Sequence, residues 1–327
     1  MSFQNKNILI TGGCGSFGQK FVEILLKEHN PQSIRIYDNR ELAAVEMERK
    51  FNDNRLRFLV GDVRDRDRLY RAVNGVDIVV HAAALKHVCI CEYNPIEAIK
   101  TNIDGAVNVI DVAIDNGVEK VMAISTDKAV QPVNLYGATK MVAEKLFVQG
   151  NVYSGARKTA FSCSRYGNVI ASSGSVIPLF LEQKKNGEIT ITDERMTRFW
   201  ITLDEGVRFV IKCIETMKGG EIFVPKIESM KILDLAKTIA PEAKVKIIGM
   251  KPGEKLHETL LTKEESVRTK EFDKYYVIEP EFSFWDKNNH KEGSIVAGVF
   301  EYKSDENGQW IEESKIKNIL ESLDIKI

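Results

Sequence analysis

The chain has 327 residues, a length that predicts about two domains. Its 46 lysine and arginine residues are balanced by 47 aspartate and glutamate residues, so the net charge at pH 7 is −1. This balance argues against a general nucleic-acid binder, because no excess positive charge is available to hold a phosphate backbone. Hydrophobic residues make up 43% of the chain, and no stretch is long and apolar enough to span a bilayer. We therefore expect a cytoplasmic protein with a large core and no membrane partner.

The five cysteines do not suggest a disulfide framework in a chain of this length. The close pair Cys89 and Cys91 has neither a second pair nor a histidine cluster beside it, which disfavours zinc ligation. The five histidines also lack the spacing of metal ligands. We expect the cysteines to pack as small side chains and predict that the protein holds no metal.

Short apolar runs alternate with amphipathic stretches through the first half of the chain. Strands are predicted over residues 7–11, 33–38, 56–61, 76–82, 120–125 and 159–165. Helices are predicted over residues 17–28, 41–51, 65–73, 95–116 and 138–149. This alternation predicts an α/β fold with a Rossmann-type, doubly wound parallel sheet that carries helices on both faces.

The regular alternation ends near residue 165. Beyond it the pattern predicts turns, short strands and isolated helices over residues 229–239, 263–267 and 313–323. We therefore predict a dinucleotide-binding domain over residues 1–165 and a smaller α/β substrate-binding part over residues 166–327. A segment near residues 203–225 is expected to return to the first domain.

A glycine-rich turn follows the first predicted strand. Residues 11–18 read Thr-Gly-Gly-Cys-Gly-Ser-Phe-Gly, which satisfies the G-x-G-x-x-G pattern and adds the G-x-x-G-x-x-G spacing of short-chain dehydrogenases. Glycines allow a tight turn and let backbone N–H groups approach a pyrophosphate at a helix N-terminus. We expect the cofactor to be held here by Gly12, Gly15, Ser16, Phe17 and Gly18.

The ends of the next strands predict further cofactor contacts. Asp38 can bind a ribose 2′-hydroxyl, which favours NAD, whereas Arg40 can neutralise the 2′-phosphate of NADP or remain a solvated loop charge. Asp62 and Val63 follow the third strand, where an acid can bond the adenine amino group. Ala82 follows the fourth strand, where a small residue lets the cofactor lie close.

The fifth strand leads to a tyrosine and a lysine at helical spacing. Tyr136 comes eleven residues after Ser125, which ends the strand. Tyr136 and Lys140 lie one turn apart on one face of the predicted helix. An ammonium beside a phenol favours the phenolate, which can remove a hydroxyl proton near neutral pH. Such a pair also arises by chance, so its position after the serine and threonine at the strand end is the stronger indication. Together with the glycine turn it predicts a nicotinamide-dependent oxidoreductase or isomerase.

Asp127 and Lys128 follow the same strand and help to distinguish between the reactions that the site could catalyse. Dehydrogenation or 4-epimerisation needs a tyrosine and a nicotinamide but no further acid or base. An additional acid and base indicate a second proton transfer, such as a β-elimination beside a new ketone. An ordinary ion pair at the strand end is the competing interpretation.

Segments that match the motifs of one known enzyme family are spread over almost the whole chain. They comprise residues 8–13, 61–65, 81–88, 92–95, 100–102, 125–129, 134–140, 165–169, 191–193, 196–201, 220–226 and 252–258. The most specific are Thr-Asp-Lys-Ala at 126–129 and Met-Thr-Arg-Phe-Trp at 196–200. In these segments the chain closely resembles the configuration-inverting UDP-N-acetylglucosamine 4,6-dehydratases of the pseudaminic acid pathway, which are extended short-chain dehydrogenases. The resemblance implies a hydro-lyase that makes UDP-2-acetamido-2,6-dideoxy-β-L-arabino-hex-4-ulose, the first step of that pathway.

The resemblance also implies roles for individual residues. Tyr136, assisted by Lys140 and Thr126, would take the C4-hydroxyl proton while hydride leaves C4 for the nicotinamide. Lys128 would take the C5 proton, and Asp127 would protonate the departing C6 hydroxyl. Hydride would return to C6, and a proton would reach the opposite face of C5. The implied substrate or cofactor contacts are Lys86, Thr101, Asn102, Asn168, Val169, Val176, Thr192, Lys251 and Glu254.

The sequence departs from the family pattern at several places. Ser173 stands where the family usually has an arginine that is a candidate diphosphate ligand, and Lys251 stands where arginine is common. Cys89 and Cys91 stand where relatives commonly carry proline and alanine. Residues 38–41 read Asp-Asn-Arg-Glu instead of the more usual Ser-Arg-Asp-Glu. The sequence at this position is therefore compatible with either NADP or NAD. The extent of the match favours NADP, with NAD as the alternative.

Two further questions have competing answers at this point. A retaining 4,6-dehydratase or a nucleotide-sugar epimerase could use the same scaffold, whereas intact Tyr136 and Lys140 disfavour a catalytically dead redox-sensing binder.

Helices over 95–116 and 136–149 carry apolar residues beyond what one sheet face can cover, which predicts a homo-oligomer built on them. These apolar residues are Val107, Ile110, Val142 and Leu146. Internal packing of these residues is the alternative.

Overall fold

The structure is a computed structural model that describes residues 3–155, 159–170, 176–281 and 290–323. Parallel strands form the centre of its main sheet: β1 (Asn7–Thr11), β2 (Ser33–Asp38), β3 (Leu56–Val60), β4 (Ile78–His81), β5 (Lys120–Thr126), β6 (Ala160–Tyr166) and β10 (Ile222–Pro225). Their order is β3-β2-β1-β4-β5-β6-β10, and all neighbours in it are parallel. Beyond β10 the sheet continues with antiparallel strands β15 (Tyr275–Ile278), β14 (Thr269–Glu271) and β16 (Ser294–Ile295).

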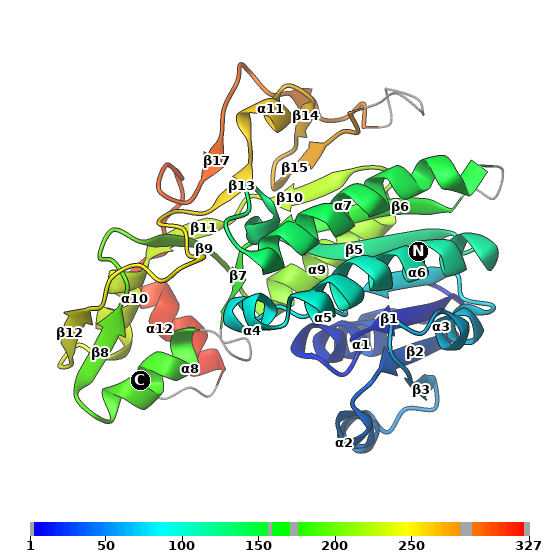
Figure 1. The fold of residues 1–327 in the computed structure, drawn as a ribbon, viewed down its shortest axis with the longest axis horizontal. Coiled ribbons are helices and arrows are strands. Elements are labelled where there is room, and N and C mark those ends of the chain that lie inside the picture. Colours follow the sequence, from blue (N-terminus) through cyan, green and yellow to red (C-terminus); the bar gives the residue numbers. More distant parts are fainter. Residues whose placement is uncertain (1–2, 156–158, 171–175, 282–289, 324–327) are drawn as a thin grey trace.

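Helices cover both faces of this sheet (Figure 1). One layer holds α3 (Arg66–Val73), α6 (Gly105–Asp115) and α7 (Leu135–Ser154), and the other holds α1 (Ser16–Glu28) and α9 (Leu203–Thr216). The central strands are apolar along their length because both of their faces are covered, and all four residues of β4 are buried. The predicted Rossmann-type α/β fold is therefore confirmed.

The C-terminal half contains smaller sheets and a second hydrophobic core. The small sheets pair β7 (Asn168–Val169), β9 (Thr197–Ile201) and β11 (Glu228–Lys231); β8 (Glu188–Ile191) and β12 (Lys244–Ile247); and β13 (Thr259–Leu261) and β17 (Tyr302–Lys303). Helices α8 (Val176–Lys184), α10 (Ile232–Ile239) and α12 (Glu313–Ser322) enclose apolar side chains that include Phe180, Leu235 and Leu320. This region lies beside the carboxyl ends of the central strands (Figure 1).

Most sequence-predicted elements agree with the structure. The strands predicted before residue 165 are present, with ends shifted by no more than two residues. The remaining helices are α2 (Glu41–Phe51), which matches its prediction, α4 (Val88–Tyr93), which was not predicted, α5 (Pro95–Ile99) and α11 (Lys263–Ser266). The segment 203–225 forms α9 and β10, and β10 is hydrogen-bonded to β6 in the main sheet.

Two helix predictions need correction. The helix predicted over 229–239 begins only at Ile232, because the preceding residues form β11 and pair with β9. Tertiary pairing there overrides an amphipathic pattern. The helix predicted over 95–116 is interrupted by a π-helical turn, Lys100–Asp104, between α5 and α6. Asn102 in that turn is buried and bonds the backbone N–H and C=O of Leu85 at 2.8 and 2.9 Å.

Candidate active site

A large cavity of about 1660 Å³ runs along the carboxyl ends of the parallel strands. This edge of an open parallel sheet is the usual ligand site of the fold. The volume exceeds the roughly 300–1,000 Å³ of a typical single-ligand pocket, so it can hold a dinucleotide and a second nucleotide together. The predicted site residues on its wall are Gly12, Gly15, Ser16, Phe17, Asp38, Arg40, Asp62, Val63, Ala82, Lys86, Thr101, Thr126, Lys128, Tyr136, Lys140, Asn168, Val169, Val176, Thr192, Lys251 and Glu254. Gly18, Asn102 and Asp127 lie behind that wall.

The glycine turn brings the N-terminus of α1 to this cavity. Gly12 has a φ of +65°, and a Cβ there would lie 2.9 Å from backbone atoms of Ala83. A Cβ on Gly18 would lie 2.2 Å from the carbonyl oxygen of Gly13. Neither position accepts a side chain without backbone movement. The turn is thus closely packed, and the N–H groups at the start of α1 can receive an anion.

The carboxylate of Asp38 is buried and already fully engaged. Its Oδ2 accepts the backbone N–H of Cys14 at 3.0 Å, and both oxygens accept hydrogen bonds from the Arg40 guanidinium at 3.0 Å. Hydrogen bonding to Asp38 raises the pKa of Arg40. The arginine therefore lies against the acid at the cavity wall and neutralises it there. Asp62 is held in the same manner by Arg64, whose hydrogen bond lowers the Asp62 pKa.

Tyr136 projects into the cavity from the start of α7. Asn134 caps the N-terminus of this helix, because its side chain accepts the backbone N–H of Gly137 at 2.8 Å. Burial raises the pKa of Tyr136 to about 12, against the opposing effects of the Lys128 charge and a hydrogen bond with Thr126. Lys140 is buried, donates to the Ile124 carbonyl at 2.7 Å and has a pKa lowered by burial. The charge of Lys128 favours the Tyr136 phenolate, and the same effect of Lys140 stays a prediction.

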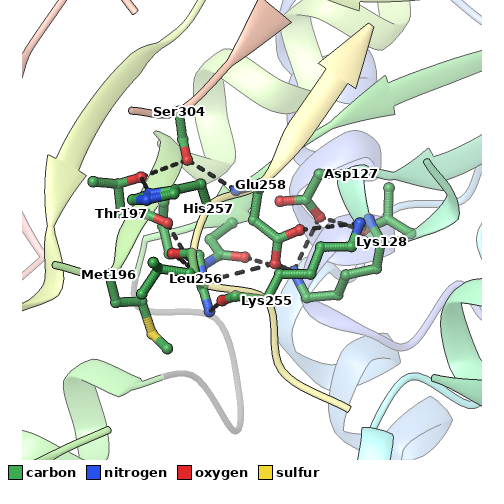
Figure 2. Close-up of polar contacts among 12 residues, drawn as sticks. Asp127, Lys128, Met196, Thr197, Lys255, Leu256, His257, Glu258 and Ser304 are labelled. Atoms are coloured by element: carbon green, nitrogen blue, oxygen red, sulfur yellow. Dashed lines mark hydrogen bonds and ion pairs between the residues drawn. The ribbon is translucent and has the colours of Figure 1, made fainter. Parts of the chain in front are cut away.

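Lys128 lies beside two buried carboxylates, those of Asp127 and Glu258, as Figure 2 shows. Its Nζ is 3.0 Å from Asp127 Oδ1, 3.0 Å from Asn168 Oδ1 and 3.7 Å from Glu258 Oε1. Burial alone would lower the Lys128 pKa, but the two carboxylates raise it above its ordinary value. Asp127 Oδ1 also accepts the Thr126 hydroxyl at 2.8 Å, whereas Oδ2 has no hydrogen-bond partner among the described residues. The site therefore holds a charged lysine that shares one carboxylate with a threonine.

The residues predicted to contact substrate come from several separate segments. Asn168 and Val169 form β7, Thr192 follows β8 and donates to the sulfur of Met196 at 3.3 Å, and Lys251 and Glu254 lie in the loop before β13. The Lys251 N–H donates to Glu254 Oε2 at 3.2 Å. These segments face the glycine turn across one cavity, as a site for two ligands requires. The predicted departure at Ser173 lies outside the described residues.

Comparisons with known proteins agree with this architecture. The sequence model of a family described as polysaccharide biosynthesis protein matches residues 8–280. An inverting UDP-N-acetylglucosamine 4,6-dehydratase of Campylobacter jejuni serotype O:2 is 51% identical, covering 97% of this chain and 98% of that protein. The chain belongs to the polysaccharide biosynthesis protein family.

Two further proteins are similar to this chain over nearly their full length. A UDP-glucose 4-epimerase of Rickettsia bellii is 39% identical, covering 98% of this chain and 97% of that protein. The X-ray structure of Pen from Bacillus thuringiensis is 37% identical, with a TM-score of 0.91 and complete coverage of both chains. The resemblance to extended short-chain dehydrogenases drawn from the motifs is therefore confirmed in both sequence and fold.

Three charged residues that line the cavity of this protein were not predicted as site residues from the sequence. Arg198, Lys255 and Glu258 line the cavity, and Glu258 lies within 3.7 Å of both cations and of Lys128. All three lie in segments that the resemblance includes, at 196–201 and 252–258. Their roles were not assigned because the segments are distant in sequence, and only the fold brings them to the end of β5.

Two absences hold for the part of the chain that the structure describes. None of its helices is long and apolar enough to cross a membrane. Its histidine, cysteine and acidic side chains form no group that could hold a metal ion.

Proposed function

We propose that this protein is a UDP-N-acetylglucosamine 4,6-dehydratase that inverts C5 of the sugar. The supporting observation is the Asp127–Lys128 pair beside Tyr136, where an acid and a base can act on a sugar whose C4 is being oxidised. The Campylobacter relative carries this activity in its name. The competing activity is the 4-epimerisation named for the Rickettsia relative, which needs no such pair.

A nicotinamide cofactor fits the glycine turn and the first turn of α1. Gly12 and Gly18, where added side chains would strike the backbone, leave room for a pyrophosphate on the helix N-terminus. When bound there, the cofactor would supply a hydride acceptor for C4 and later a hydride donor for C6. Arg40, held on Asp38, supports a preference for NADP because its guanidinium offsets the carboxylate. Mass spectrometry of cofactor released from the purified protein distinguishes NADP from NAD.

In this proposal Tyr136 removes the C4-hydroxyl proton as the C4 hydride departs. The phenol needs help to ionise because burial raises its pKa to about 12. Lys128 supplies that help through its positive charge, and Thr126 supplies it by hydrogen bonding. The ketone that results at C4 acidifies the adjacent C5 proton.

The Asp127–Lys128 pair then performs the elimination. Transfer of one proton over 3.0 Å from Lys128 Nζ to Asp127 Oδ1 converts the ion pair into a neutral amine and a carboxylic acid. The amine takes the C5 proton, and the acid protonates the C6 hydroxyl, which leaves as water. The pair returns to its charged state, and the proton taken by Tyr136 remains available for the opposite face of C5. Protons therefore balance over the cycle.

Nuclear magnetic resonance of the product distinguishes the two activities. Dehydration of UDP-N-acetylglucosamine replaces the hydroxymethyl signals with those of a methyl group, whereas epimerisation at C4 leaves the hydroxymethyl group unchanged. The same spectrum separates inversion from retention through the coupling constants at C5.

We also propose that the protein is a homo-oligomer assembled through α6 and α7. Val107 and Met141 on these helices are each more than a third exposed, with exposed fractions of 37% and 36%, while Val142 and Leu146 are half-buried. Ile110, predicted to lie on the same surface, is buried within the single chain at 4%. Light scattering at micromolar concentration should give a multiple of 36.9 kDa, and a monomer mass would contradict the proposal.

A further inference from the structure

Glu258 is a buried carboxylate that faces three cations at the end of the cavity. It is 2% exposed, and its Oε1 lies 3.7 Å from Lys128 Nζ and 3.7 Å from Arg198 Nε. Its Oε2 lies 3.7 Å from Lys255 Nζ and has no hydrogen-bond partner among the described residues. Figure 2 shows the Glu258 carboxylate directed at Lys128, beside the carboxylate of Asp127.

The backbone around Glu258 is held in place by a second strand. Its N–H donates to Ser304 Oγ at 2.9 Å, and its carbonyl accepts the Ser304 N–H at 2.9 Å. Ser304 Oγ is also 2.7 Å from Thr197 Oγ1 of β9, which bonds the ring of His257 at 2.8 Å. Three segments that are distant in sequence thus fix one carboxylate, so its place beside Lys128 is well determined.

This arrangement is costly for a purely structural role. A buried carboxylate that serves only the fold normally satisfies its oxygens with hydrogen bonds. Glu258 instead has an unpartnered oxygen and three cations at distances longer than a hydrogen bond. Arg198 is separately anchored, because it donates to the carbonyls of Thr197 and Lys255 at 2.7 and 2.9 Å. The charge of Glu258 is therefore available to Lys128.

We propose that Glu258 is a positioning residue for Lys128, which holds the lysine amine beside Asp127 and governs when that amine is free to accept the C5 proton. This inference rests on the proposed dehydratase function. The carboxylate acts through the lysine and is not itself expected to touch the sugar.

The groups around Lys128 include Asp127, Glu258, Arg198, Lys255, Asn168 and Tyr136. The two carboxylates favour the ammonium, and Arg198 opposes them. Loss of the charge on Glu258 would leave Lys128 with one carboxylate, so the amine would release its proton at lower pH.

The test compares Glu258→Gln, Glu258→Asp and wild-type protein in two assays. Deuterium incorporation at C5 of the sugar, followed from pH 6 to 10, reports the Lys128 step. Reduced-nicotinamide absorbance in a single turnover reports the earlier Tyr136 step. Glu301→Gln is the control, because this carboxylate bonds Thr259 next in sequence to Glu258 but does not face Lys128. Thermal unfolding and cofactor content verify that each variant is folded.

We expect Glu258→Gln to move the acidic limb of the C5 exchange profile down by about one pH unit or more, so that exchange at a fixed pH on that limb is roughly tenfold faster than in wild type. Glu258→Asp should keep the wild-type limb, and Glu301→Gln should match wild type in both respects. A Glu258→Gln limb at the wild-type position, or an equal displacement in Glu258→Asp, would overturn the inference. Should Glu258→Gln fail to fold, Glu258→Met, which also removes the charge, takes its place, and its limb is judged by the same outcomes. Wild-type protein that makes no 4-keto product would instead refute the proposed function.

Discussion

The Lys128 ammonium and the Asp127 carboxylate are neighbours in sequence and lie 3.0 Å apart at the carboxyl end of β5. Asp127 is completely buried, whereas about a quarter of the Lys128 side chain is exposed, at 24%, and lines the cavity. A ligand in the cavity therefore meets the lysine first, and Asp127 must act from behind it. This relationship supports the proposal that Lys128 takes the C5 proton and that Asp127 holds the exchangeable proton.

Lys128→Ala should abolish the elimination while leaving the cofactor site intact. Without the amine no base remains for C5, so we expect deuterium exchange at C5 and turnover to fall by at least about 10²-fold. Cofactor content should be unchanged, because the glycine turn lies on other strands. Lys145→Ala, on the exposed face of α7, is the control. Near-normal exchange in Lys128→Ala would remove the lysine from its proposed role.

Arg40→Ala should weaken NADP far more than NAD. The substitution removes the guanidinium that offsets Asp38, so a 2′-phosphate would face an uncompensated carboxylate. We expect a selective loss of about 1.5–3 kcal/mol in NADP binding, as for a hydrogen bond to a charged group. Titration of each cofactor by calorimetry measures the difference, with Arg49→Ala on the exposed side of α2 as control. Equal losses for both cofactors, or wild-type protein that binds NAD alone, would show that Asp38 decides the preference.

Gly18→Ala should damage the cofactor site through the backbone. Its Cβ would lie 2.2 Å from the Gly13 carbonyl oxygen, so α1 must move away from the turn. We expect a loss of stability of about 1–3 kcal/mol and little retained cofactor. Gly206→Ala in α9 is the matched helical control, because its Cβ would meet only Ile201 Cδ1 at 3.9 Å. Chemical denaturation of both variants makes the comparison, and equal stability would contradict the packing argument.

A buried ion network connects the main sheet to the C-terminal part and predicts a pH dependence of stability. Arg165 bonds Glu265 through two hydrogen bonds of 2.9 Å and also bonds Glu144, which accepts the Ser125 hydroxyl at 2.8 Å. Burial would raise the Glu265 pKa, but Arg165 lowers it below its ordinary value. A depressed folded-state pKa gives stability that is present above the unfolded value of about 4.3 and is lost as the pH falls through the folded value.

Glu265→Gln should therefore be less stable than wild type at pH 7, by about 3–5 kcal/mol for a broken buried pair. The difference should shrink as the pH is lowered below about 4, where the wild-type carboxylate becomes protonated. Urea denaturation at several pH values measures both effects. A difference that does not change with pH would indicate that the charge of Glu265 contributes little.

The local parts of the fold and site could be predicted from the sequence, because they depend on neighbouring residues. The glycines of residues 11–18 specify a turn directly, and the apolar runs of the central strands reflect burial on both faces. Tyr136 and Lys140 share a helix face by spacing alone. Gly12, Gly15, Tyr136 and Lys140 lie on the cavity wall, and Lys140 contacts the backbone of Ile124.

The rest depends on tertiary contacts that no local pattern contains. Glu258 meets Lys128 only because β13 is brought to the end of β5. Residues 229–231 pair with β9 against their helical pattern. The burial of Asp127 behind the cavity wall likewise follows from packing, not from its position in a motif.

The proton spectrum of the product formed from UDP-N-acetylglucosamine in deuterated water distinguishes the proposed dehydratase from an epimerase. An inverting 4,6-dehydratase predicts a 6-deoxy-4-keto sugar with deuterium at C5 and the coupling pattern of the L-arabino configuration. An unchanged hydroxymethyl group with inversion only at C4 would contradict the claim and identify the protein as an epimerase.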